Sequence, residues 1–315
     1  MARLDYLVTG ALGQLGRTVM ALAKQRGKTA VGVDVAEMPL DQRSAIHSVV
    51  AANQPRFVVH CGAITNVDGC EAEPLLAFRI NGLATAWVAE AAAQNSAGMV
   101  YVSTDFVFDG SQNGVPWAID ATPKPISVYG ACKRLGEEAV LAHGRSDFYV
   151  VRTSWVFGPG GKNFPRAILD RAKSGQPVKV VTDQIGRPTM THDLAEALLD
   201  VCESKAPGGI YHAANEGHCS WHQFAVDILR ESGLGSVVVG TQTAAEYAAM
   251  VVASGKKPPA PRPAWSVLDT EKLAKVRGKK LPHYVDALKR HLVLDAQAQP
   301  VAADDGKGQL RGKQY

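Results

Sequence analysis

Short apolar runs alternate with amphipathic stretches through the first half of the chain. The apolar runs predict strands at Leu4–Thr9, Ala30–Asp34, Phe57–His60, Met99–Ser103 and Phe148–Thr153. The stretches between them have apolar residues at helical spacing and predict helices at Leu15–Gln25, Ser44–Ala52, Pro74–Gln94 and Ser127–His143. Strands that alternate with helices form right-handed crossovers, with helices on both faces of a parallel sheet. The pattern therefore predicts an α/β fold with a Rossmann-type doubly wound parallel sheet.

The pattern becomes irregular after Ser154. It predicts one strand at Lys179–Thr182 and helices at Ala167–Lys173, His192–Glu203, Trp221–Glu231 and Tyr284–Leu292. The proline-rich stretch Lys256–Pro263 is predicted to be extended or loop. We therefore expect a Rossmann domain at residues 1–155, with 186–205 packing back on it, and a smaller C-terminal substrate-binding lobe at 156–185 and 206–295. Residues 296–315 have few apolar anchors and are predicted to be a disordered tail.

Composition narrows the class of protein. The 315 residues are 46% hydrophobic and 20% charged, as in an ordinary soluble globular protein. The net charge of +4 comes without a basic, aromatic-rich tract, so we expect a small-molecule substrate and no nucleic acid. No apolar run approaches the roughly 18 residues that span a bilayer, and the first strand leaves no room for a signal peptide. The five cysteines are scattered, which predicts a cytoplasmic protein with no disulfide framework and no metal.

A glycine-rich turn joins the first predicted strand to the first helix. Glycines in such a turn allow a tight bend and let a pyrophosphate approach the amides at the helix start. An ordinary strand–helix turn can have the same composition, but the position at the first strand–helix junction favours a dinucleotide site. Its residues would be Gly10, Leu12, Gly13, Gln14, Leu15 and Gly16.

Two acidic residues follow the second predicted strand. Asp34 ends that strand, where a carboxylate can hydrogen-bond the ribose hydroxyls of an adenosine. This position favours NAD over NADP, because a 2′-phosphate would meet a carboxylate, although a solvated loop aspartate is the alternative. Asp41 can contact the adenine or cap the next helix. We expect NADPH or NADH as the cofactor.

Three residues in the middle of the chain occur in the order that is typical of the catalytic residues of a carbonyl reductase. Tyr129 and Lys133 are four residues apart on a predicted helix and share a face. A neighbouring cation lowers the pKa of a phenol from about 10. Thr104 ends a strand, where its hydroxyl can hydrogen-bond a carbonyl oxygen or act as an ordinary turn residue. Together with the glycine turn, the set predicts carbonyl–alcohol redox chemistry.

The chain resembles the extended short-chain dehydrogenases/reductases and, within them, the dTDP-4-dehydrorhamnose reductase family. The matching strings run in order up to about Leu292: VTGALGQLG, YVSTDFVFDG, VYGACKRLGEE, VVRTSWVFGPGGKNF, TDQIGRPT and APRPAWSVLDTEKL. The later strings belong to the substrate lobe and are not generic to Rossmann proteins. The resemblance implies NAD(P)H-dependent reduction of the 4-keto group of a nucleotide-activated deoxysugar. The expected reaction converts dTDP-4-dehydro-β-L-rhamnose to dTDP-β-L-rhamnose.

The resemblance also implies roles for individual residues. Thr104, Tyr129 and Lys133 would be the catalytic triad, with Tyr129 as the proton donor. Further cofactor contacts would come from Cys61, Gly62, Ala63, Asn81 and Ser103. The substrate would contact Thr104, Asp105, Phe106, Trp155, Asn163 and Arg262. A buried core tryptophan is the alternative for Trp155, and a surface salt bridge is the alternative for Arg262.

Three departures from the family pattern bear on substrate and assembly. Phe106 stands where many relatives have a tyrosine, and residues 248–257 look like an insertion. Thr18 stands where some relatives have a glutamate that binds magnesium at a dimer contact. A monomer and a homodimer both remain open. So do a ketoreductase of another sugar nucleotide or small carbonyl compound and a non-enzymatic NAD(P)-binding regulatory subunit.

Overall fold

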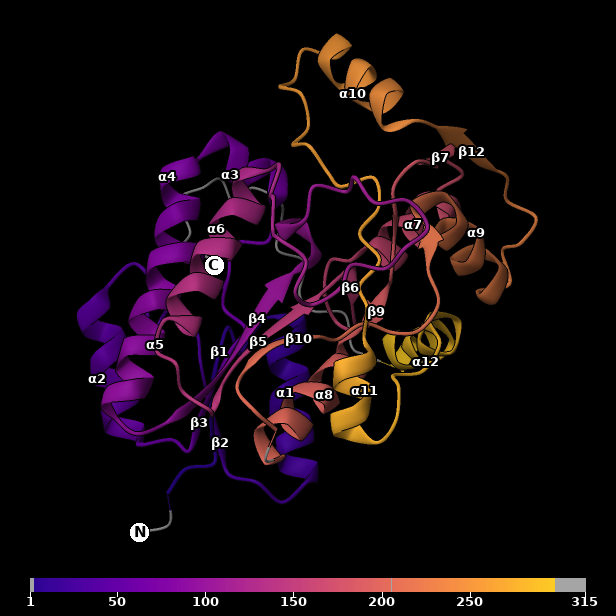
Figure 1. The fold of residues 1–315 in the computed structure, drawn as a ribbon. Helices are drawn as coiled ribbons and strands as arrows, with labels where there is room; N and C mark the ends of the chain where they lie inside the picture. The colour runs from indigo at the N-terminus through magenta and orange to yellow at the C-terminus, as the bar shows by residue number, and fades with distance from the viewer. Residues whose placement is uncertain (1–2, 205, 298–315) are drawn as a thin grey trace.

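The centre of the molecule is a six-stranded parallel sheet with the order β10-β5-β4-β3-β1-β2 (Figure 1). The computed structural model describes residues 3–204 and 206–297. The strands are β1 (Tyr6–Thr9), β2 (Ala30–Val33), β3 (Phe57–His60), β4 (Gly98–Thr104), β5 (Phe148–Thr153) and β10 (Gly209–His212). The order reverses between β1 and β3, and ligands of such sheets bind at the carboxyl ends of the strands there. The predicted doubly wound parallel sheet is confirmed.

Helices cover both faces of this sheet. They are α1 (Gln14–Gln25), α2 (Arg43–Asn53), α5 (Ala84–Gln94), α6 (Val128–Leu141) and α8 (Thr191–Glu203). Alternate residues of the strands point to opposite faces. Val8 and Val100 are buried in the same cluster as residues of α1 and α8, whereas Leu7 and Met99 are buried with residues of α2, α5 and α6. Both faces of the sheet are therefore buried, which explains why the sequences of the strands are continuous apolar runs.

The segment predicted as one helix at Pro74–Gln94 is divided. It consists of α4 (Pro74–Ala77), a π-helical turn η1 (Phe78–Leu83) and α5, and it is preceded by the short helix α3 (Val67–Ala72). Asn81 lies in the π turn and is buried. Its side chain is hydrogen-bonded to the main chain of Ile64, at 2.8 Å from the amide and 2.9 Å from the carbonyl. These two hydrogen bonds depend on the π-helical turn, and the helical periodicity of the sequence does not reveal such a turn.

The second half of the chain builds a smaller packed unit beside the sheet. Its elements are β6 (Val156–Phe157), α7 (Phe164–Lys173), β7 (Val178–Val181), β8 (Ile185–Gly186), β9 (Thr189–Met190), β11 (Cys219–Ser220), α9 (Trp221–Glu231), β12 (Val239–Gln242), α10 (Ala244–Ala253) and α12 (Tyr284–Gln297). A separate core joins Phe157, Ile168, Phe224 and Ile228. Figure 1 shows α10 standing apart from this core at the top of the molecule.

The structure corrects two of the predicted boundaries. β10 pairs with β5, so residues 209–212 belong to the large sheet and not to the smaller lobe. The helix α11 (Glu271–Arg277) also packs on α8 and β10. Ala296 and Gln297 are the last residues of α12, although we expected them to begin the tail. The rest of that tail, 298–315, lies outside the described residues, and the division into domains otherwise stays a prediction.

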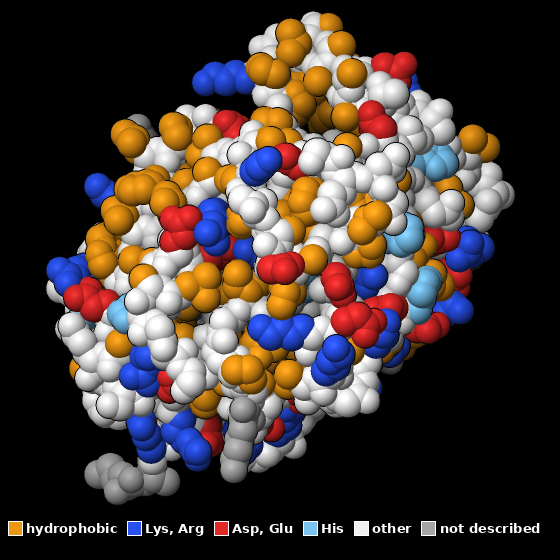
Figure 2. Space-filling model, in the orientation of Figure 1, with side chains coloured by type: hydrophobic (Ala, Val, Ile, Leu, Met, Phe, Trp, Pro, Cys, Tyr) orange, Lys and Arg blue, Asp and Glu red, His pale blue; other side chains and the backbone are white. Residues whose placement is uncertain are grey.

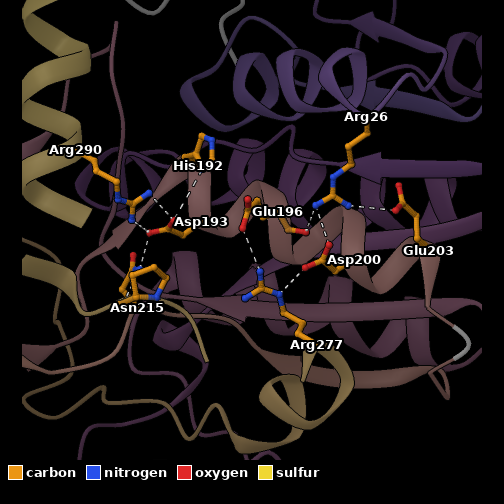
Figure 3. Close-up of polar contacts among 10 residues, drawn as sticks. Arg26, His192, Asp193, Glu196, Asp200, Glu203, Asn215, Arg277 and Arg290 are labelled. Carbon is orange, nitrogen blue, oxygen red and sulfur yellow. Dashed lines mark hydrogen bonds and ion pairs between the residues drawn. The ribbon is translucent and has the colours of Figure 1, made fainter. Parts of the chain in front are cut away.

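Helix α8 is tied to its neighbours by ion pairs (Figure 3). Asp200 of α8 lies 2.8 Å from Arg26 of α1 and 2.6 Å from Arg277 of α11. Asp193, near the start of α8, lies 2.6 Å from Arg290 of α12. Segment 191–203 thus connects the sheet with the smaller unit. None of the helices in the described part of the chain is long and apolar enough to cross a membrane.

Candidate active site

The glycine turn lies between β1 and α1, at the carboxyl edge of the sheet. Gly10 has a φ of +64°, and a Cβ atom there would lie 2.8 Å from Gly62 Cα. A Cβ at Gly16 would lie 2.2 Å from the Gly10 carbonyl oxygen. Both positions therefore require glycine for close packing of the turn. The Gly13 amide donates to the Gly10 carbonyl at 3.0 Å, so the amides that a diphosphate could use are those of the first turn of α1, from Gln14 onward.

Asp34 lies directly beside this turn. Its Oδ2 accepts a hydrogen bond from the Leu12 amide at 2.9 Å, and its Oδ1 accepts one from the Val35 amide at 2.9 Å. The carboxylate is thus held at the end of β2, next to the loop that would bind the cofactor. The N-cap residue of α2 is Gln42, so Asp41 does not cap that helix. Asp41 Oδ1 is buried and has no partner among the described residues.

The other predicted cofactor residues follow the ends of β3 and β4. Cys61, Gly62 and Ala63 come directly after β3. The Asn81 amide is used to hold the main chain of Ile64, just beyond this segment. The Ser103 hydroxyl donates to Glu137 Oε1 at 2.7 Å, in the protein interior. In this structure Asn81 and Ser103 therefore have structural partners, and their contacts with a cofactor stay a prediction.

The structure brings Thr104, Tyr129 and Lys133 together at the carboxyl end of β4. Tyr129 and Lys133 lie on α6, which begins after Ser127. The Thr104 hydroxyl lies beside the Tyr129 phenol. Lys133 Nζ donates to the Val102 carbonyl at 2.7 Å and lies over the Tyr101 ring.

Gly130 of α6 allows Tyr129 to lie this close to Thr104. A Cβ at Gly130 would lie 2.2 Å from the Phe106 carbonyl oxygen. Glycine there lets α6 approach η2 (Asp105–Val107), the short helix that follows Thr104. The approach brings Tyr129 next to the end of β4.

Burial is the main cause of the pKa shifts of Lys133 and Tyr129. Burial lowers the pKa of Lys133 to about 7, and the Glu137 charge opposes this shift. Burial raises the pKa of the Tyr129 phenol above its ordinary value, the Thr104 hydrogen bond opposes the rise, and the Asp105 charge adds to it. The expected lowering of the phenol pKa by Lys133 is therefore wrong for this structure, because desolvation dominates. A phenol with a raised pKa is protonated near neutral pH.

The carboxylate of Glu137, which the sequence analysis did not single out, holds the elements that carry Thr104, Tyr129 and Lys133. Glu137 lies one turn beyond Lys133 on α6 and is fully buried. Its carboxylate accepts hydrogen bonds from Arg152 on β5, at 2.8 Å from Nε and 2.7 Å from Nη2. An arginine within the apolar strand Phe148–Thr153 is the one sequence signal for this pair, because a buried guanidinium requires a partner.

A cavity of about 580 Å³ adjoins the triad. Phe106 connects the two, because it lines the cavity and packs edge-on against the Tyr129 ring at 5.7 Å. Trp155 also lines the cavity, and its ring stacks on Trp221 with centroids 3.6 Å apart and planes 6° apart. One face of Trp155 is thus already covered by Trp221.

Two further predicted substrate residues, Asn163 and Arg262, are held by protein partners. Arg262 lines the cavity, but its Nη2 donates to both oxygens of Asp68 at 3.1 and 3.0 Å. Asn163 Nδ2 donates to the Gly158 carbonyl at 2.7 Å, and Asn163 Oδ1 accepts from the Arg166 amide at the start of α7. Asn163 is not among the residues that line the cavity. Its contact with substrate stays a prediction that this geometry does not support.

Several cavity residues were not predicted to contact the substrate, although Gln184 and Ser266 lie within the strings TDQIGRPT and APRPAWSVLDTEKL. They come from separate elements of the second half and meet only in the folded protein: Lys179, Gln184, Trp221, Tyr247 and Ser266. Tyr247 belongs to α10, which contains no buried residue. Figure 2 shows the hydrophobic side chains of this helix exposed at the top of the molecule. The segment that we interpreted as an insertion therefore begins beside the cavity wall.

The described residues contain no group of three or more His, Cys, Asp and Glu side chains arranged to hold a metal ion. All five cysteines are free.

Comparison with known proteins identifies the family. Residues 4–296 match the family model described as the RmlD substrate binding domain. The chain is 40% identical to spore coat polysaccharide biosynthesis protein SpsK of Bacillus subtilis, covering 91% of this chain and 96% of that protein. It is 37% identical to dTDP-4-dehydrorhamnose reductase of Streptomyces griseus, covering 90% and 91%.

A solved structure supports the same family. The dTDP-4-dehydrorhamnose reductase of Bacillus anthracis, in complex with NADP, has a TM-score of 0.84 and 30% identity, covering 93% of this chain and 99% of that one. The parallel sheet, the glycine turn and the grouped Thr104, Tyr129 and Lys133 define an oxidoreductase of the extended short-chain dehydrogenase/reductase class. Within that class, the chain belongs to the dTDP-4-dehydrorhamnose reductase family of NAD(P)-dependent oxidoreductases.

Proposed function

We propose that this enzyme reduces the 4-keto group of a nucleotide-activated deoxysugar, with dTDP-4-dehydro-β-L-rhamnose as substrate and dTDP-β-L-rhamnose as product. The observation that carries the proposal is the continuity, through Phe106, between the 580 Å³ cavity and the triad. This volume lies within the range of small-molecule sites, about 300–1,000 Å³. The relatives named as dTDP-4-dehydrorhamnose reductases support the choice of sugar nucleotide.

The cofactor site fits NADPH or NADH. The glycine turn provides main-chain amides at the start of α1, and Asp34 stands beside them. The bound cofactor supplies a hydride to the keto carbon. The main-chain amides of Gln14 and Leu15, in the first turn of α1, would hold its diphosphate, and Asp34 would accept hydrogen bonds from the ribose hydroxyls.

The proton is supplied by the protein. Burial raises the pKa of the Tyr129 phenol, so the phenol carries its proton near neutral pH and can give it to the nascent alkoxide. The Thr104 hydroxyl would stabilise the same oxygen. Lys133 would orient the nicotinamide ribose. This assignment makes Tyr129 the general acid of the reduction.

The test is direct assay of the purified full-length chain. NADPH or NADH is incubated with dTDP-4-dehydro-β-L-rhamnose, with other dTDP-4-keto sugars, and with a simple ketone that lacks a nucleotide. We expect cofactor oxidation with the rhamnose precursor and none with the simple ketone. Faster turnover of another keto sugar would identify a different substrate, which Phe106 and the α10 segment make a specific alternative. Cofactor binding without oxidation of any ketone would indicate a regulatory subunit.

We also propose a cytoplasmic location, which the five free cysteines support. Whether the enzyme is a monomer or a homodimer is a separate question, and sedimentation of the full chain answers it.

A further inference from the structure

Asp105 is a buried carboxyl group beside the triad. It follows Thr104, begins η2, and is 1% exposed. Its Oδ1 lies 3.1 Å from Thr104 Oγ1, whereas its Oδ2 is buried without a partner among the described residues. Ser266, which lines the cavity, lies beside the same carboxyl group. Asp105 therefore lies between the reaction centre and the cavity wall.

Counting donors and acceptors shows what Asp105 does to Thr104. A threonine hydroxyl donates one hydrogen bond and accepts two. The Phe106 amide donates to Thr104 Oγ1 at 3.2 Å, which uses one acceptor direction. An ionised Asp105 can only accept, so it would take the single proton of Thr104. Thr104 could then donate neither to a substrate carbonyl nor to the Tyr129 oxygen.

A neutral Asp105 reverses this arrangement. A proton on its Oδ1 is donated to Thr104 Oγ1, which fills the second acceptor direction of that hydroxyl. The proton of Thr104 is then free to point at the reacting oxygen. Only this form allows Thr104 to stabilise negative charge on the substrate.

The surroundings of Asp105 favour the neutral form. A buried carboxylate is stable when a cation pairs with it, and no ion pair within the described residues involves Asp105. The neighbouring hydroxyls of Ser266 and Thr104 and the amides of Asp105 and Phe106 act to lower its pKa, but burial outweighs them. On the neighbouring elements, Lys133 donates to a main-chain carbonyl, Arg262 is paired with Asp68, and Tyr129 is the titratable group that faces the carboxyl. In agreement, burial raises the pKa of Asp105 to about 7.

We propose that Asp105 is a positioning residue for the reduction and that turnover requires its carboxyl group in the neutral form, so that Thr104 donates to the substrate oxygen. The proposal rests on the proposed ketone reduction. The proton of Asp105 is not consumed, because it only sets the direction of the Thr104 hydrogen bond. Asp105 thus acts through Thr104 and not as a direct ligand of the sugar.

The experiment is a kcat profile from about pH 5.5 to about pH 9.5 with saturating cofactor and ketone, for wild type, Asp105→Asn and Asp109→Asn. The wild-type kcat should fall above an inflexion near neutral pH, where Asp105 and Lys133 both titrate, since each has a pKa of about 7. The Asp105→Asn amide can donate to Thr104 at every pH, so its profile should fall less steeply than that of wild type and keep only the contribution of Lys133. Asp109→Asn is the matched control in the same segment and should keep the wild-type profile.

Three results of this kinetic experiment would overturn the proposal. One is an unchanged inflexion in Asp105→Asn. Another is an Asp105→Asn enzyme that folds and binds NADPH but is inactive at every pH. If that variant does not fold, Thr104→Val removes the hydroxyl through which Asp105 acts. A residual activity of Thr104→Val that falls as steeply with pH as wild type is the third.

A measurement without substrate separates this proposal from the proposed function. The infrared spectrum of wild type at about pH 6 should contain the carbonyl stretch of a buried carboxylic acid, and Asp105→Asn should lack it. If wild type reduces no ketone, the proposed function fails while this spectrum still reports on Asp105. If wild type has no such band, the neutral form is absent and the inference fails.

Discussion

Glu137 Oε2 accepts a hydrogen bond from Arg152 Nη2 at 2.7 Å, and both side chains are almost completely buried. The pair joins α6, which carries Tyr129 and Lys133, to β5 of the central sheet. Glu137 also accepts a hydrogen bond from Ser103, one residue before Thr104. The ion pair therefore fixes the helix and the strand end that together carry the triad.

Replacing Glu137 with glutamine should destabilise the fold. Arg152 would keep its charge in a dry interior but lose its carboxylate, which typically costs about 3–5 kcal/mol. Urea denaturation of wild type and Glu137→Gln measures the difference in unfolding free energy. Glu138→Gln is the matched control, because Glu138 is the next residue of α6 and pairs with Arg134 at the surface. Its change should stay within about 1 kcal/mol, and equal losses would contradict the role of Glu137.

Tyr129→Phe should nearly abolish turnover and leave cofactor affinity intact. The change removes only the phenol hydroxyl, and general acid catalysis contributes about 100- to 10,000-fold. Stopped-flow oxidation of NADPH measures turnover, and a fluorescence titration measures the cofactor Kd. A variant that keeps more than about a tenth of wild-type kcat would show that another group is the acid.

The cofactor half of the site could be predicted from the sequence because its determinants are local. Gly16 is constrained by contacts within one strand–turn–helix unit, Gly10 has a positive φ in the turn, and Asp34 comes at the end of the next strand. The strand Phe57–His60 is found with the predicted bounds, because both of its faces are buried and its apolar run is continuous.

The cavity could not be predicted in the same way, because its walls come from distant segments. Phe106, Trp155 and Trp221 meet only through the packing of the second half. Strand β10 is four residues long and half of it is only partly buried, so its apolar pattern is weak. The partners of Asn81 and Arg262 likewise depend on side-chain orientation, which neither spacing nor composition specifies.

Asp34→Ala should weaken NADH binding more than NADPH binding. The carboxylate would accept hydrogen bonds from the ribose of NADH, whereas it opposes a 2′-phosphate. A charge-assisted hydrogen bond contributes about 1.5–3 kcal/mol, which is roughly a 10- to 100-fold change in Kd. Both affinities should fall somewhat, because Asp34 also accepts from the Leu12 amide in the turn. Titration with each cofactor gives the ratio, and equal losses would exclude contact between Asp34 and the ribose.

The buried Lys133 should make stability depend on pH. Burial lowers its pKa from 10.5 to about 7, so between these values the unfolded chain holds a proton that the folded protein has largely released. The unfolding free energy from Lys133 should therefore rise with pH across this window and be lost as pH falls through about 7. Urea denaturation of wild type and Lys133→Met at several pH values isolates this slope. Parallel curves for the two proteins would show that Lys133 keeps its proton on folding.

Arg262 has both a cavity position and a salt bridge to Asp68, so two variants are needed to separate binding from structure. Arg262→Ala removes the guanidinium. Asp68→Asn removes only the charge of its partner, and the Asp68 Oδ1 position that accepts from the Ala260 amide can still be occupied by an oxygen.

If Arg262 binds the diphosphate of the substrate, Arg262→Ala should raise KM and lower kcat/KM by one to two decades, since a charge-assisted contact contributes about 1.5–3 kcal/mol. Asp68→Asn should leave KM unchanged or lower it, because the guanidinium no longer has a competing carboxylate. Cofactor affinity should be unchanged in both variants. A purely structural salt bridge predicts the opposite pattern: equal losses of thermal stability in the two variants and an unaltered KM in both. Steady-state kinetics and thermal denaturation of the two proteins decide between these outcomes.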